Sequence, residues 1–595
     1  MRWSSQHFTA TTWSTAGREM IKKPSMIDVL RNRIRAARGE IAPDLILKGG
    51  RVVNVFTHEI LETDVAIYDG IVVGTGSYGG GRHLDARGQY ICPGFIDGHF
   101  HIESTMLSAT ELARAVLPFG TTSIVADPHE IANVMGRRGI DYIIESSKGL
   151  PVDFYIMLPS CVPATHLETS GAVLSSEDLM GLKGENRVLG LAEIMNYPGV
   201  ITAADAVLEK IASFSNMIKD GHAPLLSGKD LNAYLAAGLR SDHECTEFSE
   251  AREKIRLGMH IMIREGALAK NLRTLLPIVS AATVGQCSLV TDDLHPHDLL
   301  YKGHLNHLID LATSQGIDPV LSIVMVTLST ARFFGFRDLG AVALGYRADI
   351  LILSSLYPMT VRTVIKNGCI VHDGGRLTDE SAEPPCTNSL SPMNIRAYEP
   401  NSFAIPQGGE LIRIIGLIPD QIITKGSVGK APLLGGAVVS DTEQDLIKIA
   451  VVERHHGTGN IGLGMVQGFG LREGALASSV AHDSHNIISV GCNDRDIFVA
   501  VKAVEKMGGG LAAVKNGEVL SRMSLPIAGL MSCEPLGKVA HGWEEMREAA
   551  GNLGCSLKEP FMALSFLALP VIPELKITDR GLVDVKEFRH VPLFV

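Results

Sequence analysis

The sequence predicts an α/β protein, with a (β/α)8 TIM-like barrel, a flanking small β-sandwich and a C-terminal α+β domain. Three observations predict this class. Segments with similar short, strand-like apolar runs lie on both sides of a central part of the chain. Strands and helices alternate within this central part, and a region with both strands and helices follows a polar stretch near the C-terminal third. The predicted boundaries are 1–43 for an N-terminal tail, 44–92 plus 341–375 for the β-sandwich, 93–340 for the barrel, 376–400 for a linker and 401–595 for the C-terminal α+β domain.

The two flanks share short apolar runs separated by glycine-containing turns. LILKGGRVVNV, DVAIYDG and IVVGTG lie within residues 44–91, and the same texture returns at ADILILSS (348–355) and VRTVIKNGCIV (361–371). Such runs are typical of antiparallel strands. We therefore expect one β unit built from both flanks of a central insert.

The central insert alternates between strand-like and helix-like segments. Eight such units in about 200 residues indicate a barrel that is compact beside the typical size of about 250. The fifth strand has the shortest apolar run. The expected strands are GFIDGHFH (94–101), TTSIVADP (121–128), DFYIMLPS (153–160), VLGLAEI (188–194), the segment around DGHAPLL (220–226), GLRSDHE (238–244), MHIMIREG (259–266) and QCSLVTDD (286–293).

The composition of the chain limits which binding partners and which cellular compartment we expect for the protein. The net charge of −11, from 54 basic and 65 acidic residues, gives no basic footprint for nucleic acid and favours a small substrate. Nine scattered cysteines without a CxxC pair indicate reduced thiols and a cytoplasmic protein. The N-terminus lacks the apolar region of a signal peptide. The sequence contains no run of about 18 apolar residues, so no membrane span is expected.

The strongest local motif is GFIDGHFHIES, in which His99 and His101 are two positions apart. On a strand these side chains point to the same face. At the C-terminal end of a barrel strand, where barrel active sites lie, they would converge on one metal ion. A lone HxH is weak evidence, because two polar residues at a strand end explain most such pairs.

Four further strand ends carry ionisable residues, and this set strengthens the interpretation. Glu193 closes VLGLAEI, His222 lies in DGHAP, His243 lies in RSDHE, and Asp292 ends SLVTDD. Imidazole and carboxylate groups are ligands for zinc, iron and manganese. A single one of these residues is readily explained as a core histidine or a helix cap, whereas six in this order are not.

This order of ligands resembles the amidohydrolase superfamily, and the motifs resemble its bacterial adenine deaminases. Many superfamily members use a carboxylated lysine on the fourth strand, where this chain has Glu193. The resemblance covers approximately residues 44 to 590 and rests on these segments: PGFIDGHFHIEST, VADPHEIANV, GLAEIMNYPGV, GHAPLLSGKDLNAY, SDHE, VTDDLHP and VAHDSHNIISVGCNDRDI.

The resemblance implies hydrolytic deamination of adenine to hypoxanthine and ammonia, as in purine salvage, at a centre of two divalent ions. Mn²⁺ or Fe²⁺ is implied, with Zn²⁺ as an alternative. His99, His101 and Asp292 would hold one ion, His222 and His243 the other, and Glu193 both. Asp292 is the expected acid–base residue and Glu193 the second catalytic residue. A homo-oligomer, with a dimer favoured, is common in the superfamily.

Five other residues are weaker candidates for contacts with the purine base. Glu103 follows the HxH pair on the same face if the strand continues, and Asp127 and His129 end the second strand. Asp483 and His485 lie with His482 and Asn486 in AHDSHN, which the resemblance places over the barrel mouth. Each has a simpler explanation, as a loop residue, a residue supporting the ligands or a solvated surface group.

Two alternatives differ in their chemistry. Another amidohydrolase, such as a cyclic amidase or a sugar N-deacetylase, would keep the barrel and metals but change the pocket. A phosphosugar deacetylase would need basic residues, for which Arg264 and Lys302 are the candidates. A non-catalytic scaffold would be free to lose ligands, yet every expected ligand type is present. Metal analysis and substrate profiling distinguish the three.

Overall fold

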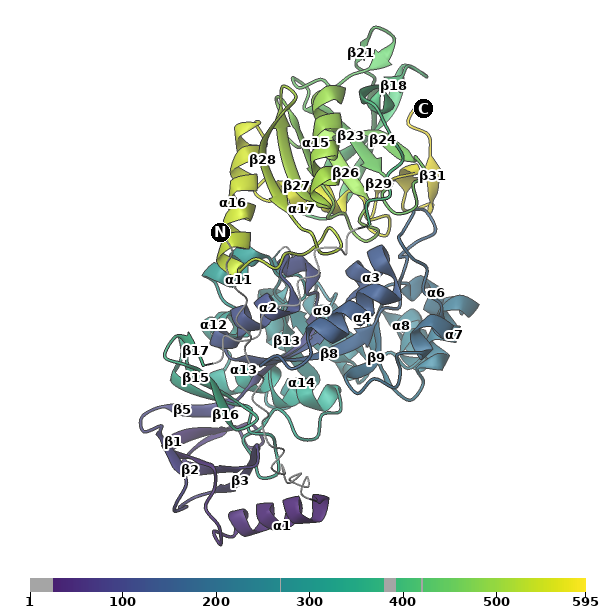
Figure 1. Cartoon of the computed structure of the whole chain (residues 1–595). Coiled ribbons are helices and arrows are strands. Elements are labelled where there is room, and N and C mark those ends of the chain that lie inside the picture. The colour runs from purple at the N-terminus through teal and green to yellow at the C-terminus, as the bar shows by residue number, and fades with distance from the viewer. Residues whose placement is uncertain (1–24, 268, 379–391, 419–420) are drawn as a thin grey trace, which may run out of the picture.

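The computed structural model describes residues 25–267, 269–378, 392–418 and 421–595. Figure 1 shows three parts stacked along one axis, with a β sheet at the lower end, the barrel in the middle and the C-terminal domain at the top. One buried apolar cluster includes residues of both the barrel and the C-terminal domain. These two parts are therefore packed against each other through a shared core.

The barrel contains eight parallel strands in sequence order. Two hydrogen-bonded groups, β10-β9-β8-β7-β6 and β11-β12-β13, make up the ring. The α/β class is confirmed, and each expected strand segment contains one of these strands, at least in part. Their bounds are β6 (Phe95–Phe100), β7 (Thr121–Ala126), β8 (Asp153–Leu158), β9 (Val188–Ile194), β10 (Ile218–Gly221), β11 (Ser241–Asp242), β12 (His260–Arg264) and β13 (Cys287–Val290).

The ring closes at two junctions where the ladder is short. Between β13 and β6, the Asp292 amide donates to the His99 carbonyl at 3.1 Å, and the His101 amide donates to the Asp292 carbonyl at 3.3 Å. Between β10 and β11, a Cβ on Gly221 would lie 1.9 Å from the Ser241 carbonyl oxygen, so this approach requires glycine. The fifth strand overlaps its predicted segment only at residues 220–221, because the chain leaves the sheet before Pro224.

Helices separate the strands and cover the ring on the outside. Several begin at a side-chain cap; the Ser108 hydroxyl, for example, accepts from the Glu111 amide at the start of α2. The bounds are α2 (Ala109–Val116), α3 (His129–Met135), α4 (Arg137–Ser146), α5 (Ser176–Met180), α6 (Tyr197–Ile201), α7 (Asp205–Ser213), α8 (Gly228–Ala236), α9 (Phe248–Arg256), α10 (Leu272–Leu275), α11 (Pro296–Tyr301), α12 (Leu305–Ser314), α13 (Pro319–Met325) and α14 (Leu328–Phe333).

The two flanks of the barrel meet in a single hydrogen-bonded sheet of nine strands. Its joint is the antiparallel pairing of β5 with β14, which brings the segment before the barrel beside the segment after it. The bounds are β1 (Leu45–Asn54), β2 (Glu59–Tyr68), β3 (Ile71–Thr75), β4 (Arg82–Asp85), β5 (Tyr90–Pro93), β14 (Ile350–Leu356), β15 (Met359–Lys366), β16 (Cys369–Asp373) and β17 (Arg376–Leu377).

A helix lies within the segment that the sequence predicts to be an N-terminal tail. Helix α1 (Met26–Ala37) begins at Ser25, whose hydroxyl accepts from the Asp28 amide, and it buries Ala36 against Ala66 and Val73 of the flanking sheet. The predicted tail over 1–43 therefore contains a packed helix, and its bounds stay a prediction. Residues 1–24 lie outside the described part, as do residues 379–391 of the predicted linker.

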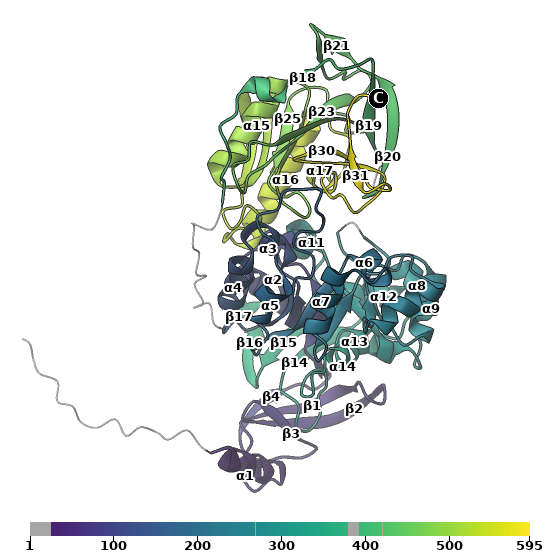
Figure 2. The ribbon, with the colours of Figure 1, turned by 90° about the vertical axis from the view of Figure 1, so that its right-hand side faces the viewer.

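The described part of the C-terminal domain has an eight-stranded sheet with helices and two three-stranded sheets, one of β18, β22 and β21 and one of β29, β30 and β31. Figures 1 and 2 both place it over one end of the barrel, next to α3 and α11. The bounds are β18 (Ile405–Pro406), β19 (Leu411–Leu417), β20 (Thr424–Lys430), β21 (Leu433–Leu434), β22 (Ala437–Val438), β23 (Leu446–Val452), β24 (Ile461–Gln467), β25 (Ala475–Ser478), β26 (Ile487–Gly491), α15 (Asp494–Met507), β27 (Gly510–Lys515), β28 (Glu518–Ser524), α16 (Leu536–Asn552), α17 (Pro560–Phe566), β29 (Leu575–Thr578), β30 (Gly581–Asp584) and β31 (Arg589–Val591).

Two global expectations are also addressed by the structure. Among the described residues, no helix is long and apolar enough to cross a membrane. Seven cysteines in this part of the chain are free thiols, whereas Cys533 is disulfide-bonded. The expectation of reduced thiols throughout is therefore wrong at Cys533.

Candidate metal centre

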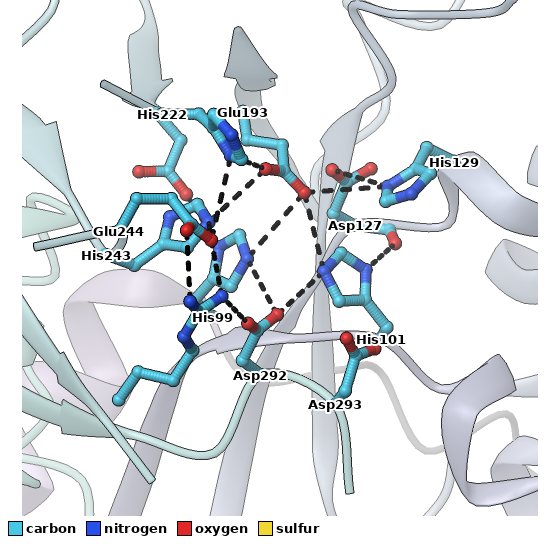
Figure 3. Close-up of polar contacts among 12 residues, drawn as sticks. His99, His101, Asp127, His129, Glu193, His222, His243, Glu244, Asp292 and Asp293 are labelled. Carbon is cyan, nitrogen blue, oxygen red and sulfur yellow. Dashed lines mark hydrogen bonds and ion pairs between the residues drawn. The ribbon is translucent and has the colours of Figure 1, made fainter. Parts of the chain in front are cut away.

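Six side chains from five barrel strands or the loops that follow them converge at the C-terminal mouth of the barrel (Figure 3). Five of the six are buried, and the sixth, His222, is 21% exposed at its side chain. All were predicted from the sequence as metal ligands, and the structure brings them together. They are His99, His101, Glu193, His222, His243 and Asp292.

The first group gathers four donor atoms around one point. The Asp292 Oδ1 atom lies 3.0 Å from His101 Nε2 and 3.4 Å from His99 Nε2. The Glu193 Oε1 atom lies 3.4 Å from His101 Nε2 and 3.9 Å from His99 Nε2. Atoms held about 2.0–2.2 Å from a common ion at near-tetrahedral or octahedral angles are roughly 3–3.5 Å apart. The group therefore has the spacing of a metal site.

The second group forms on the other oxygen of the same glutamate. The Glu193 Oε2 atom lies 2.7 Å from His222 Nδ1 and 3.3 Å from His243 Nε2. Glu244 extends this side, with Oε1 3.6 Å from His243 Nε2 and 4.0 Å from His222 Nδ1. Figure 3 shows Glu193 between the two groups. A carboxylate with each oxygen in a different cluster is suited to bridge two ions.

Hydrogen bonds on the far side of two rings fix which nitrogen is available. The Nδ1–H group of His99 donates to Asp220 Oδ2 at 2.9 Å, and that of His101 donates to the Asp127 carbonyl at 3.1 Å. In each ring Nε2 is therefore the atom that can offer a lone pair to an ion once the ring is neutral, and His99 Nε2 is buried without a hydrogen-bond partner. This arrangement, in which a carboxylate or carbonyl orients the ring, is typical of metal-ligating histidines. The donor set therefore fits divalent ions.

The charges of the cluster shift the pKa values of its members away from their usual ranges. Burial alone would lower the pKa of His99, but the carboxylates of Asp220 and Asp292 outweigh it and raise that pKa well above its usual value. Burial would raise the pKa of Glu193, yet His222 and His243 hold it well below its usual value. Both carboxylates of the cluster therefore stay ionised at neutral pH, since the pKa of Asp292 is lowered in the same way by Arg264 and His101.

Arg264 places Asp292 in a defined orientation. Its guanidinium, at the end of β12, contacts Asp292 Oδ2 at 2.6 Å and also pairs with Glu244. Arg264 therefore binds the Oδ2 atom of Asp292, while the Oδ1 atom faces His99 and His101. Asp292 itself has a left-handed backbone with φ of 59°, a conformation that aspartate adopts more readily than most residues.

Asp127 and His129, two of the predicted substrate-contact residues, lie beside the first group, and a third, Glu103, is buried two positions after His101. His129 Nδ1 is 3.2 Å from Asp127 Oδ2 and 3.7 Å from Glu193 Oε1. Glu103 Oε1 accepts from the Ile131 amide at 3.0 Å. Asp127 Oδ1 and Glu103 Oε2 are buried without hydrogen-bond partners. Unpaired buried acceptors are uncommon, and here they mark polar capacity that a ligand or water would satisfy.

The other two predicted contacts come from the C-terminal domain. Asp483 and His485 are buried in the loop after β25, and Asp483 Oδ2 and His485 Nε2 are buried without hydrogen-bond partners. The loop reaches the barrel through His482, whose Nδ1 lies 3.1 Å from Glu130 Oε1. The structure thus places AHDSHN over the barrel mouth, but it does not bring Asp483 and His485 into the ligand cluster.

The sequence analysis missed four residues that shape the site. Glu244 and Glu130 each stand next to a residue that was singled out, and Asp220 stands two positions before His222, so their nearness to these candidates was an available signal. Arg264 was considered only as a possible phosphate contact, and its pairing with Asp292 corrects that interpretation. Lone Arg and Glu residues at strand ends do not reveal their partners.

Two family models match long stretches of the chain. A family model described as "Amidohydrolase family" matches residues 90–371, and one described as "Adenine deaminase C-terminal domain" matches residues 421–589. The solved structure of dihydropyrimidinase from Brevibacillus agri has a TM-score of 0.44 at 16% identity, covering 56% of this chain and 96% of that chain.

Curated relatives match almost the whole chain. Adenine deaminase of Desulfatibacillum aliphaticivorans is 51% identical, covering 94% of this chain and 99% of the relative. Adenine deaminase of Methanothrix thermoacetophila is 48% identical, covering 95% and 100%. Adenine deaminase 2 of Carboxydothermus hydrogenoformans is 47% identical, covering 95% and 99%. With such identity over nearly their full length, the chain belongs to the adenine deaminase family of the amidohydrolases.

Proposed function

We propose that the cluster at the barrel mouth hydrolyses adenine to hypoxanthine and ammonia, the reaction for which the relatives are named, at a centre of two divalent ions. The observation that carries the proposal is the position of Glu193, with one oxygen facing His99 and His101 and the other facing His222 and His243. When bound, such ions supply a water that is activated near neutral pH.

The ligand assignment follows the two groups. His99, His101 and Asp292 would hold one ion, His222 and His243 the other, and Glu193 would bridge them. Glu244 stands near the second position and would complete it or orient a water there. Carboxylate oxygens and imidazoles together suit Mn²⁺ and Fe²⁺ and also permit Zn²⁺, so we propose Mn²⁺ or Fe²⁺.

Asp292 is the proposed proton carrier. Its Oδ1 atom faces the cluster while Arg264 holds Oδ2. It would accept one proton from the attacking water as the water oxygen bonds to C6 of adenine. It would then give that proton to the departing amino nitrogen, so that the C6–N bond breaks and ammonia leaves. A carboxylate with so low a pKa is a weak base, so this role depends on close positioning.

Glu103 is the proposed donor to the purine ring. Burial, with the neighbouring Glu130 carboxylate, raises its pKa to about 7, and its Oε2 atom has no hydrogen-bond partner. A carboxyl group that is partly protonated near neutral pH is suited to donate to a ring nitrogen of adenine. Glu103 would give its proton to the ring nitrogen as the water oxygen bonds to C6, and the second proton of that water would return to Glu103 as C6 becomes a carbonyl. Hypoxanthine then carries a proton on the ring nitrogen, Glu103 is restored, and the reaction balances.

The remaining predicted residues have supporting roles in this proposal. Asp127 and His129 form a pair beside Glu193, where they would contact the base or hold the ligands in place. Asp483 would close the site from the C-terminal domain with His485. The homo-oligomer, the cytoplasmic location and the domain boundaries stay predictions.

The test is ammonia release from a panel of aminopurines, cyclic amides and N-acetyl sugars by protein loaded with Mn²⁺ or Fe²⁺. We expect release from adenine and its loss after chelation, because the attacking water depends on the metal. Turnover of an amide or an acetyl sugar with silence on adenine would contradict the proposed substrate while keeping the metal centre.

A further inference from the structure

Two loops of the C-terminal domain contact three loops of the barrel mouth. The first, residues 481–486, contacts Glu130 through His482 and donates from Asn486 Nδ2 to the Thr169 carbonyl at 2.8 Å. The second, residues 525–532, pairs with the loop after β6. The Ser532 amide donates to the Met106 carbonyl at 2.8 Å, and the Ser108 amide donates to the Ser532 carbonyl at 2.8 Å.

These contacts fall on the loops that carry the proposed substrate contacts. Glu103 lies in the segment after β6, Asp127 follows β7, and His129 begins the helix α3 that comes next. The third contacted loop follows β8. These two loops of the C-terminal domain therefore contact three of the eight segments that follow the barrel strands at the mouth, so the way the two loops are held bears on those segments.

Arg454 joins these two loops from inside the C-terminal domain. Its guanidinium donates from Nε to the His485 carbonyl and from Nη2 to the Ala528 carbonyl, the latter at 2.9 Å. Its backbone amide donates to Asn486 Oδ1 at 3.2 Å. The residue is fully buried, and within the described part of the chain it makes no ion pair with a carboxylate. Burying an unpaired cation is costly, so a structural requirement has to offset it.

The two carbonyls that Arg454 binds belong to unusual backbone positions. His485 has φ of 53° and Ala528 has φ of 57°, both in the left-handed region that disfavours residues with a Cβ. A neighbouring ring adds a third contact, since His455 Nε2 lies 2.7 Å from the Ser484 carbonyl. The guanidinium therefore binds both loops at residues whose backbone conformation is disfavoured for side chains with a Cβ.

We propose that Arg454 is a positioning residue for the deamination. By binding the His485 and Ala528 carbonyls, it holds the loops 481–486 and 525–532 against the barrel loops that present Glu103, Asp127 and His129 to the substrate. The inference rests on the proposed function, because it concerns the same site. It assigns the C-terminal domain a part in turnover, through a residue that touches neither metal ligand nor base.

The test compares Arg454→Met with a matched control, Lys448→Met. Lys448 is also a buried cation of this domain, on β23, where it contacts the Phe403 carbonyl and pairs with Asp494, away from the two loops. Both variants remove a buried positive charge. We expect kcat/KM for adenine to fall at least about tenfold in Arg454→Met with the parent's metal content, because small displacements of positioned groups are costly. Lys448→Met should stay within about twofold of the parent.

A second variant covers the case in which Arg454→Met does not fold. Lysine at 454 keeps the charge but lacks the planar fork that reaches both carbonyls. We expect Arg454→Lys to show faster amide hydrogen exchange in residues 481–486 and 525–532, and a raised KM for adenine. Hydrogen exchange needs no turnover, so it distinguishes failure of this inference from failure of the adenine reaction. Parent-like exchange in both loops, or equal losses of kcat/KM in Arg454→Met and Lys448→Met, would overturn it.

Discussion

Replacing Glu193 with glutamine is expected to remove adenine turnover and most of the bound metal. The side-chain amide offers one oxygen in place of two, so it cannot hold an ion at each end as Glu193 is positioned to do. The loss of turnover should be at least about 10³-fold, which corresponds to roughly 4 kcal/mol of activation free energy. Metal content per chain, measured by plasma mass spectrometry, and ammonia release together check this result.

A control carboxylate lies on the barrel wall. Glu111 is buried on α2 and pairs with Arg114, outside the metal centre. Glu111→Gln should keep the parent's metal content and turnover within about twofold. If Glu193→Gln retained two ions per chain and parent-like turnover, the bridging role of Glu193 would be refuted.

Replacing Asp292 with asparagine is expected to lower kcat for adenine by about 10²–10⁴-fold, the usual size of a general acid–base contribution. The amide cannot accept the water proton or return it to the amino group. It would also lose the charge that pairs with Arg264 at 2.6 Å, so some metal loss is expected as well. Turnover measured at saturating metal distinguishes the loss of proton transfer from the loss of the ion.

The neighbouring Asp293 provides the comparison. It is part of the same turn after β13, and its Oδ1 accepts from the Ser104 hydroxyl at 2.5 Å. Asp293→Asn should lower kcat by less than about tenfold, because a neutral hydrogen-bond partner remains there. Near-normal kcat in metal-loaded Asp292→Asn would leave Asp292 as a ligand only, and equal losses in both variants would point to a general effect of charge.

The convergence of the six side chains at the barrel mouth was predictable because these residues follow a simple geometric rule. His99 and His101 are two positions apart at the end of β6, so their side chains point to the same face. Glu193 and Asp292 end apolar runs, and parallel strands bring all four residues to the same end of the barrel. The local sequence predicts each strand, and the parallel arrangement of the barrel brings the C-terminal ends of the strands together. The eight strands were predictable for the same reason, apart from the early end of β10.

The groups that orient the cluster were not predictable from local patterns. The hydrogen bond between His99 Nδ1 and Asp220 joins residues 121 positions apart, and the sequence around these two residues does not indicate that they pair. The same holds for Arg264 with Asp292 and for Arg454 with the Ala528 carbonyl. Helix α1 differs, since Ser25 and Asp28 form a local cap that the polar surroundings obscured. Side-chain pairs between residues far apart in the sequence are recognised only in the three-dimensional structure.

The claim of a two-ion centre is tested most directly on the unmodified chain. Chelator-stripped protein is titrated with Mn²⁺ while ammonia release from adenine is followed. The two oxygens of Glu193 face separate histidine pairs, so activity should rise to a plateau at about two equivalents per chain, with none before metal is added. Full activity of the stripped protein, or a plateau at about one equivalent, would contradict the two-ion centre.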